Sequence, residues 1–192
     1  MTGNDIVDLQ VAAAENNWRR KGFTEKIFTP QEQQYINYAA KPDAMVWRLW
    51  TMKESAYKIY TRQYGGRFFA PQKFSCTLLT GTNGLVAANK ICYQTITVTA
   101  KDHIYTIART EGTENTEFIN SCFSLPETDP GKQQQFIHTK MVDCCHSLTG
   151  ELKKNISVVK DKNGIPFLNC NSNLQIPVSI THHGYFAAFT IY

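Results

Sequence analysis

Residues 50–58 read WTMKESAYK, and this stretch lies inside a helix that the sequence predicts over about residues 44–61. Apolar side chains recur there at the helical period, and Asp43 is the expected N-cap. Glu54 and Lys58 are four residues apart, so they share one face of this helix. They form either an ordinary surface ion pair or, because bulky aromatic side chains flank them, the polar part of a partly buried pocket.

A second polar stretch lies at the N-terminus, where residues 2–9 (TGNDIVDL) are predicted to form a short strand. Asp5 and Asp8 are three residues apart on this strand and therefore point to opposite faces, so one of them can join a given site. Burying an unpaired carboxylate beside Ile6 and Val7 costs several kcal/mol. A metal ion would explain such an aspartate; a turn or capping role for Asp5 is the alternative.

A third polar stretch, SITHHG at residues 179–184, lies near the C-terminus. Ser179 and Thr181 face the same way on a strand, and His182 and His183 begin the turn that follows. Hydroxyl and imidazole groups at a strand end can donate hydrogen bonds to phosphate oxygens. A hairpin with exposed polar residues is the alternative, whereas zinc is excluded because adjacent histidines point apart.

The remaining patterns predict helices set against a mostly antiparallel sheet, which is an α+β fold. Thr29-Pro30-Gln31-Glu32 is a helix start with a capping box, and a second long helix is predicted over residues 132–148. Residues 111–131 are polar and contain Pro126 and Pro130, which indicates a loop. The predicted strands cover residues 74–80, 91–99, 104–110, 156–160, 165–170, 178–182 and 185–191.

Composition predicts one globular domain over residues 1–192 and excludes disorder, since 42% of the 192 residues are apolar and 19% are charged. Neither a secretory signal nor a run long enough to span a membrane is seen, so a cytoplasmic location is expected. The six cysteines are accordingly interpreted as reduced. A net charge of +4 suits a phosphate-bearing ligand or an acidic protein partner, but it is too small to indicate nucleic acid.

The three polar stretches, taken in this order, resemble those of the 4'-phosphopantetheinyl transferases, and the holo-[acyl-carrier-protein] synthase branch in particular. Residues 3–8 resemble its GTDIVE motif, and residues 23–32 resemble FTERILTPAE. Residues 50–59 are similar to FAAKEAxxKA, Gly164-Ile165-Pro166 to a Gly-Lys-Pro turn, and residues 179–183 to SISHS. The resemblance covers about residues 1–60 and 150–192; the segment from about 66 to 150 is longer here than in the synthases.

The resemblance implies an enzyme that transfers the 4'-phosphopantetheine arm of coenzyme A to a serine of an apo carrier protein and releases 3',5'-ADP. It implies Mg²⁺ held by Asp5 and Glu54, with Glu54 or a water it holds as the general base. Lys58 would neutralise phosphate charge or assist departure of the ADP. The coenzyme A phosphates would be bound by Ser179, Thr181 and His182.

Departures from the family pattern occur at Val7, where larger relatives carry a further acidic ligand, and at His183, which replaces a serine. The basic cluster Arg19-Arg20-Lys21 is either a docking surface for an acidic carrier or a solvated charge run. The single copy of each motif implies a homo-oligomer, a trimer by resemblance, with the site between subunits. The alternative function is a non-catalytic carrier-protein binding module. A nucleotide hydrolase with a phosphate-binding loop is excluded, because Gly-x-x-x-x-Gly-Lys-[Ser/Thr] is absent.

Overall fold

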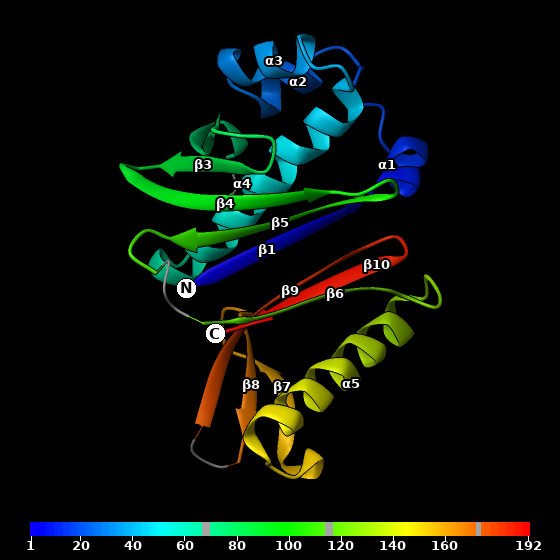
Figure 1. Cartoon of the computed structure of the whole chain (residues 1–192), viewed down its shortest axis with the longest axis vertical. Helices are drawn as coiled ribbons and strands as arrows, with labels where there is room; N and C mark the ends of the chain where they lie inside the picture. The colour runs from blue at the N-terminus through cyan, green and yellow to red at the C-terminus, as the bar shows by residue number, and fades with distance from the viewer. Residues whose placement is uncertain (67–69, 114–116, 172–173) are drawn as a thin grey trace.

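The computed structural model describes residues 1–66, 70–113, 117–171 and 174–192, and it confirms the predicted α+β class. Two five-stranded antiparallel sheets lie one above the other in Figure 1, each with a long helix against it. The strand order is β1-β5-β4-β3-β2 in the first sheet and β6-β10-β9-β8-β7 in the second. The strands are β1 Thr2–Asp8, β2 Ser75–Leu78, β3 Asn83–Ala88, β4 Ile91–Thr99, β5 His103–Thr110, β6 Ile119–Ser124, β7 Ile156–Lys160, β8 Pro166–Cys170, β9 Leu174–His183 and β10 Phe186–Ile191.

The first sheet is covered by α4 (Pro42–Tyr64), which carries the WTMKESAYK stretch, and α2 and α3 lie on the far side of this helix (Figure 1). Gly3 lets α4 approach β1 closely, because a Cβ atom at this position would overlap the carbonyl oxygen of Ser55. Leu49, Met52 and Ala56 on α4 are fully buried in the core of this sheet. The shorter helices are α1 Leu9–Glu15, α2 Phe23–Ile27 and α3 Pro30–Asn37, with a 3₁₀ turn at Pro71–Lys73.

The second sheet has its own core, which it forms with α5 (Pro130–Thr149). In the chain, β6 precedes this helix. Ile137, Met141 and Cys145 recur at helical spacing on α5 and are buried against the sheet. A 3₁₀ turn at Lys153–Asn155 connects α5 to β7. Among the described residues, neither α4, α5 nor any other helix has the length and apolar character that a membrane span requires.

The two halves of the chain share one topology, although the sequence shows no internal repeat. Each half begins with a strand (β1 or β6), continues through a long helix (α4 or α5), and ends with four strands in the same spatial order. The segment 66–150 is therefore divided between the halves: its described residues complete the first sheet and begin the second. Each sheet has its own core, and the two cores meet along one seam. That the chain forms a single domain remains a prediction.

The seam is formed by β1 and β9, whose contact is made by side chains rather than by a backbone ladder. The amides of Asn4 and Ile6 donate to the hydroxyl oxygens of Ser179 and Thr181 at 3.2 and 3.3 Å. The amide of Asp8 donates to His183 Nδ1 at 3.0 Å. Alternate residues of β9 thus occupy the edge of β1 that β5 leaves open, which is how an exposed strand edge is satisfied here.

Several local predictions are confirmed and others are wrong. Thr29 caps α3 with the expected capping box, whereas Asp43 does not cap α4. Its carboxylate instead pairs with Arg19 at 2.8 Å and accepts from the Trp18 ring, contacts that lower the pKa of Asp43 to about 2. Asp8, not Asp5, has the capping role, at the start of α1. The segment 111–131, predicted to be a loop, contains the strand β6. Residues 114–116 of this segment lie outside the described residues.

Candidate active site

Asp5, Glu54 and Lys58 lie together where β1 crosses α4. Lys58 Nζ donates to the backbone carbonyl of Asn4 at 2.7 Å and to Asp5 Oδ1 at 3.2 Å. It also reaches the carbonyl of Ile180 on β9 at 3.4 Å, so this one ammonium group connects both sheets. The helix places Glu54 one turn before Lys58, on the same face.

The carboxylates of Asp5 and Glu54 carry like charges and lie close to each other. Burial, followed by the negative charge of Asp5, raises the pKa of Glu54 to about 7, and Lys58 opposes this shift. One ammonium group therefore does not fully compensate the buried carboxylate of Asp5 and the half-buried carboxylate of Glu54. A hard divalent cation with oxygen ligands would compensate them, so the donor set fits Mg²⁺ with two protein carboxylates. Across the described residues there is no third acidic, His or Cys ligand in reach.

The residues predicted on β9 reach this region in different ways. Thr181 is buried and donates its hydroxyl hydrogen to Asp5 Oδ1 at 2.9 Å, so it orients that carboxylate. Ser179 is also buried and accepts the amide of Asn4, and it lines a cavity. The side chain of His182 reaches the surface; desolvation and the nearby Lys58 charge lower its pKa, which favours the neutral imidazole.

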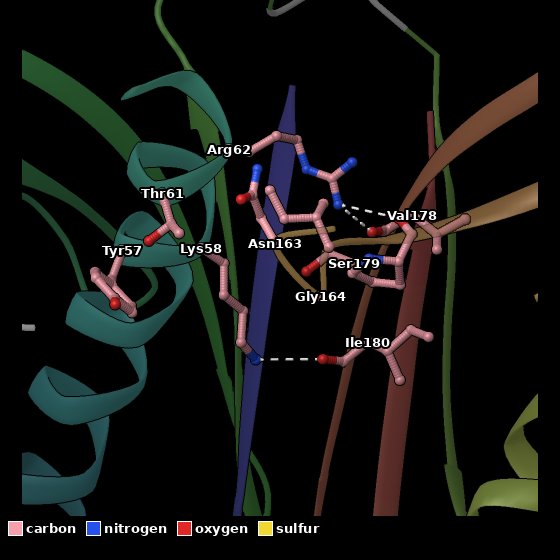
Figure 2. A pocket seen from close by; sticks show the side chains of 11 residues that line it. Tyr57, Lys58, Thr61, Arg62, Asn163, Gly164, Val178, Ser179 and Ile180 are labelled. Carbon is pink, nitrogen blue, oxygen red and sulfur yellow. Dashed lines mark hydrogen bonds between the residues drawn. The ribbon is translucent and has the colours of Figure 1, made fainter. Parts of the chain in front are cut away.

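A cavity of about 310 Å³ opens beside Lys58, between α4 and β9 (Figure 2). One wall carries Lys58 and Arg62 from α4, and the turn Gly164-Ile165-Pro166, together with Val178 and Ser179, lies opposite. The turn is the one predicted to correspond to Gly-Lys-Pro in the family. Lys58 and Ser179 in this lining come from two of the three polar stretches, and Lys58 also contacts Asp5 of the N-terminal stretch.

Arg62 lies outside the motifs that predicted the site. Its guanidinium donates to the carbonyl of Val178 at 2.6 Å (Figure 2) and to that of Pro166 at 3.3 Å. It also lies over the ring of Phe167. No salt bridge joins it to a carboxylate in the described part of the chain. The signal that could have identified it is its spacing, since it follows Lys58 by four residues and extends the same helix face.

Arg48, near the start of α4, is engaged within the first sheet, where it donates to the carbonyl of Thr80 at 3.0 Å. In the basic cluster, Arg19 is held by Asp43, and Arg20 lies over the Phe23 ring. Lys21 is exposed. The cluster is therefore a surface feature near α2, and part of its charge is already neutralised.

Comparison with known proteins gives the class to which this fold and site belong. The family model described as "4'-phosphopantetheinyl transferase superfamily" matches residues 1–108, more than half of the chain, and the chain belongs to that superfamily. Transfer of a phosphopantetheinyl group is the activity for which the superfamily is named. No curated protein matches the chain.

Two solved structures are similar to this chain. A holo-[acyl-carrier-protein] synthase from Neisseria meningitidis has a TM-score of 0.47 and 16% identity, covering 57% of this chain and 96% of that one. A holo-[acyl-carrier-protein] synthase from Thermotoga maritima has a TM-score of 0.42 and 11% identity, covering 91% of this chain and 83% of that one.

Proposed function

We propose that this chain transfers the 4'-phosphopantetheine arm of coenzyme A to a serine hydroxyl of an apo carrier protein, in a Mg²⁺-dependent reaction that releases 3',5'-ADP. The observation that supports this most is the convergence of Asp5, Glu54 and Lys58 beside a cavity that also presents Arg62. Two carboxylates suit a divalent cation, and two cationic side chains suit a diphosphate.

Each residue has a role that follows from its position. Asp5 and Glu54 would hold the cation, which when bound neutralises the diphosphate and the charge on the leaving group. Glu54, or a water that it holds, accepts the proton of the carrier serine. Lys58 neutralises phosphate charge at the edge of the cavity. Thr181 keeps Asp5 in position, because its single hydroxyl hydrogen is donated there.

The coenzyme A phosphates are the proposed ligands of Ser179 and His182. The Ser179 oxygen accepts one hydrogen bond from β1, which leaves its own hydrogen to donate to a ligand in the cavity. His182, on the exposed side of β9, donates one N–H as a neutral imidazole. Arg20 and Lys21 remain the candidates for contact with an acidic carrier, because Arg19 is already paired with Asp43.

The proposed site is assembled within one chain. β1 and α4 belong to the first half, whereas β9 belongs to the second, and they meet through the contacts of Lys58 and Thr181. We therefore infer that transfer does not require a neighbouring subunit to complete the site. The trimer implied by the resemblance remains a prediction to be checked by the mass of the active species in solution.

The central experiment mixes the protein with an apo carrier protein, coenzyme A and Mg²⁺ and determines the mass of the intact carrier. The expected result is a gain of one phosphopantetheine arm on the carrier, with release of 3',5'-ADP. A metal chelator should abolish the gain, and excess Mg²⁺ should restore it. Acyl and peptidyl carriers are tested in parallel, since the sequence does not select between them.

The alternative, a non-catalytic carrier-binding module, makes a different prediction in the same experiment. A module would form a complex with the apo carrier and leave its mass unchanged in every combination of metal and coenzyme A. The presence of Asp5, Glu54 and Lys58 together favours the enzyme, because binding a carrier surface requires none of them. An unmodified carrier in a stable complex would therefore replace our proposal with the alternative.

Replacing Arg62 is expected to affect binding of coenzyme A more than turnover. Arg62→Ala should raise the KM for coenzyme A by about 10-fold and change kcat less than about 3-fold, the effect of losing one charge-assisted contact. Arg62→Lys should recover part of this loss. Because Arg62 also donates to two carbonyls, thermal unfolding of both variants is measured as well. A lower midpoint with an unchanged KM in the folded protein would limit Arg62 to a structural role.

A further inference from the structure

Outside the proposed active site, three side chains form a connected chain across the seam, here called the Cys122 cluster: Cys122, His103 and Asp102. Cys122 lies on β6 in the second sheet, whereas His103 begins β5 in the first. His103 Nδ1 lies 2.7 Å from Asp102 Oδ1, and His103 Nε2 lies 3.9 Å from Cys122 Sγ. The imidazole thus lies between a carboxylate and a thiol.

These two contacts determine which nitrogen of the His103 ring carries the hydrogen. With Nδ1–H donated to Asp102, the lone pair of Nε2 is directed at the thiol of Cys122 and can accept its proton. The ring of Phe186 packs on the ring of His103, with centroids 4.5 Å apart and a tilt of 32°, which limits rotation of the imidazole. Cys122 is thus a nucleophile in contact with a base, His103, and Asp102 orients that base.

Exposure distinguishes this thiol from the others. Cys122 is the exposed cysteine of the six, while Cys92 and Cys144 are half-buried, and the remaining three are buried. His103 has 19% of its side chain exposed and Asp102 has 52%, so small reagents can approach the cluster from solvent. The three groups do not converge on one point, since the ring separates sulfur from carboxylate, and the described residues form no metal-binding set here.

The thiol is not ionised in advance. Partial desolvation, and after it the negative charge of Asp102, raises the pKa of Cys122. At neutral pH the sulfur is therefore protonated, and its attack on an electrophile requires a base to remove the proton. His103 is the base in contact with it, and Asp102 stabilises the imidazolium that forms.

We propose that the Cys122 cluster is a site of covalent modification by small disulfides, with His103 as the base. The Cys122 thiol proton passes to His103 Nε2 while Sγ attacks one sulfur of the disulfide. A new S–S bond forms as that of the reagent breaks, and the departing thiolate takes up the proton from His103. Cys122 is thereby oxidised to a mixed disulfide, and the other half of the reagent is reduced to a free thiol.

The experiment uses the intact protein and 2-hydroxyethyl disulfide, an uncharged reagent that the surface charge neither attracts nor repels. Samples are quenched with acid over time, and peptide mass mapping gives the rate of adduct formation at each cysteine. Cys122 should react at least about 10-fold faster than Cys92 or Cys144, which serve as internal controls within the same molecule.

His103→Asn should reduce the rate at Cys122 by about 10-fold and leave the rates at Cys92 and Cys144 unchanged. Asp102→Asn should reduce the rate at Cys122 by a smaller factor. Because Asp102 is exposed, this substitution should not disturb folding. Equal rates at the control cysteines also show that each variant is folded. The proposal is overturned if Cys92 or Cys144 reacts first, or if both variants keep the wild-type rate at Cys122. Neither readout depends on transferase activity.

Discussion

Glu54→Gln is expected to reduce the rate of phosphopantetheinyl transfer by on the order of 10³-fold while the chain remains folded. The substitution keeps the size of the side chain but removes the negative charge that, together with Asp5, would hold the divalent cation. It also removes the proposed base. Folding should not suffer, because burial and Asp5 raise the pKa of Glu54 to about 7, so ionisation of this side chain does not stabilise the folded chain. The initial rate is measured from the mass of the carrier.

A second readout separates loss of the cation from general damage. Added Mg²⁺ should raise the thermal unfolding midpoint of the wild-type protein and leave that of Glu54→Gln unchanged. The matched control is Glu127→Gln, which removes a glutamate whose ion pair with Lys132 is largely exposed and should affect neither rate nor midpoint. If Glu54→Gln transferred the arm at the wild-type rate, the assignment of Glu54 would be wrong.

Local patterns allowed much of the fold to be predicted. The capping box at residues 29–32 and the strands at residues 91–99 and 156–160 are found as expected, because each depends on side chains close in sequence. Asp43 shows the limit of this reasoning. It has the residue type of a helix cap, yet a charged partner 24 positions away, Arg19, holds its carboxylate instead.

The site required contacts that no local pattern contains. Asp5, Glu54 and Lys58 were predicted as a set from the resemblance, but their meeting depends on Gly3, which lets α4 lie against β1. The pairing of β1 with β9 is encoded by alternate side chains 175 residues apart, such as Asn4 with Ser179. The second half repeats the strand order of the first without repeating its sequence, so no motif indicated that β6 opens another sheet.

Lys53 precedes Glu54 in the chain, and its position predicts a large effect on stability rather than on chemistry. Its side chain is fully buried, and Nζ donates to Glu32 Oε1 at 2.8 Å and to the carbonyls of Pro71 and Phe74 at 3.0 and 2.6 Å. Glu32 is also fully buried and accepts the amide of Cys76. This ion pair therefore joins α3, α4 and the start of β2.

Lys53→Met is expected to lower the free energy of unfolding by about 3–5 kcal/mol, because it leaves the Glu32 carboxylate buried without its counter-charge. Urea denaturation measures this change. The double variant with Glu32→Gln should recover a large part of it, since the amide keeps the cap on α3 without a buried charge. Arg19→Ala, which breaks an exposed ion pair, should cost less than about 1 kcal/mol. A Lys53→Met protein of wild-type stability that had lost turnover would contradict this structural role and would instead place Lys53 in the reaction.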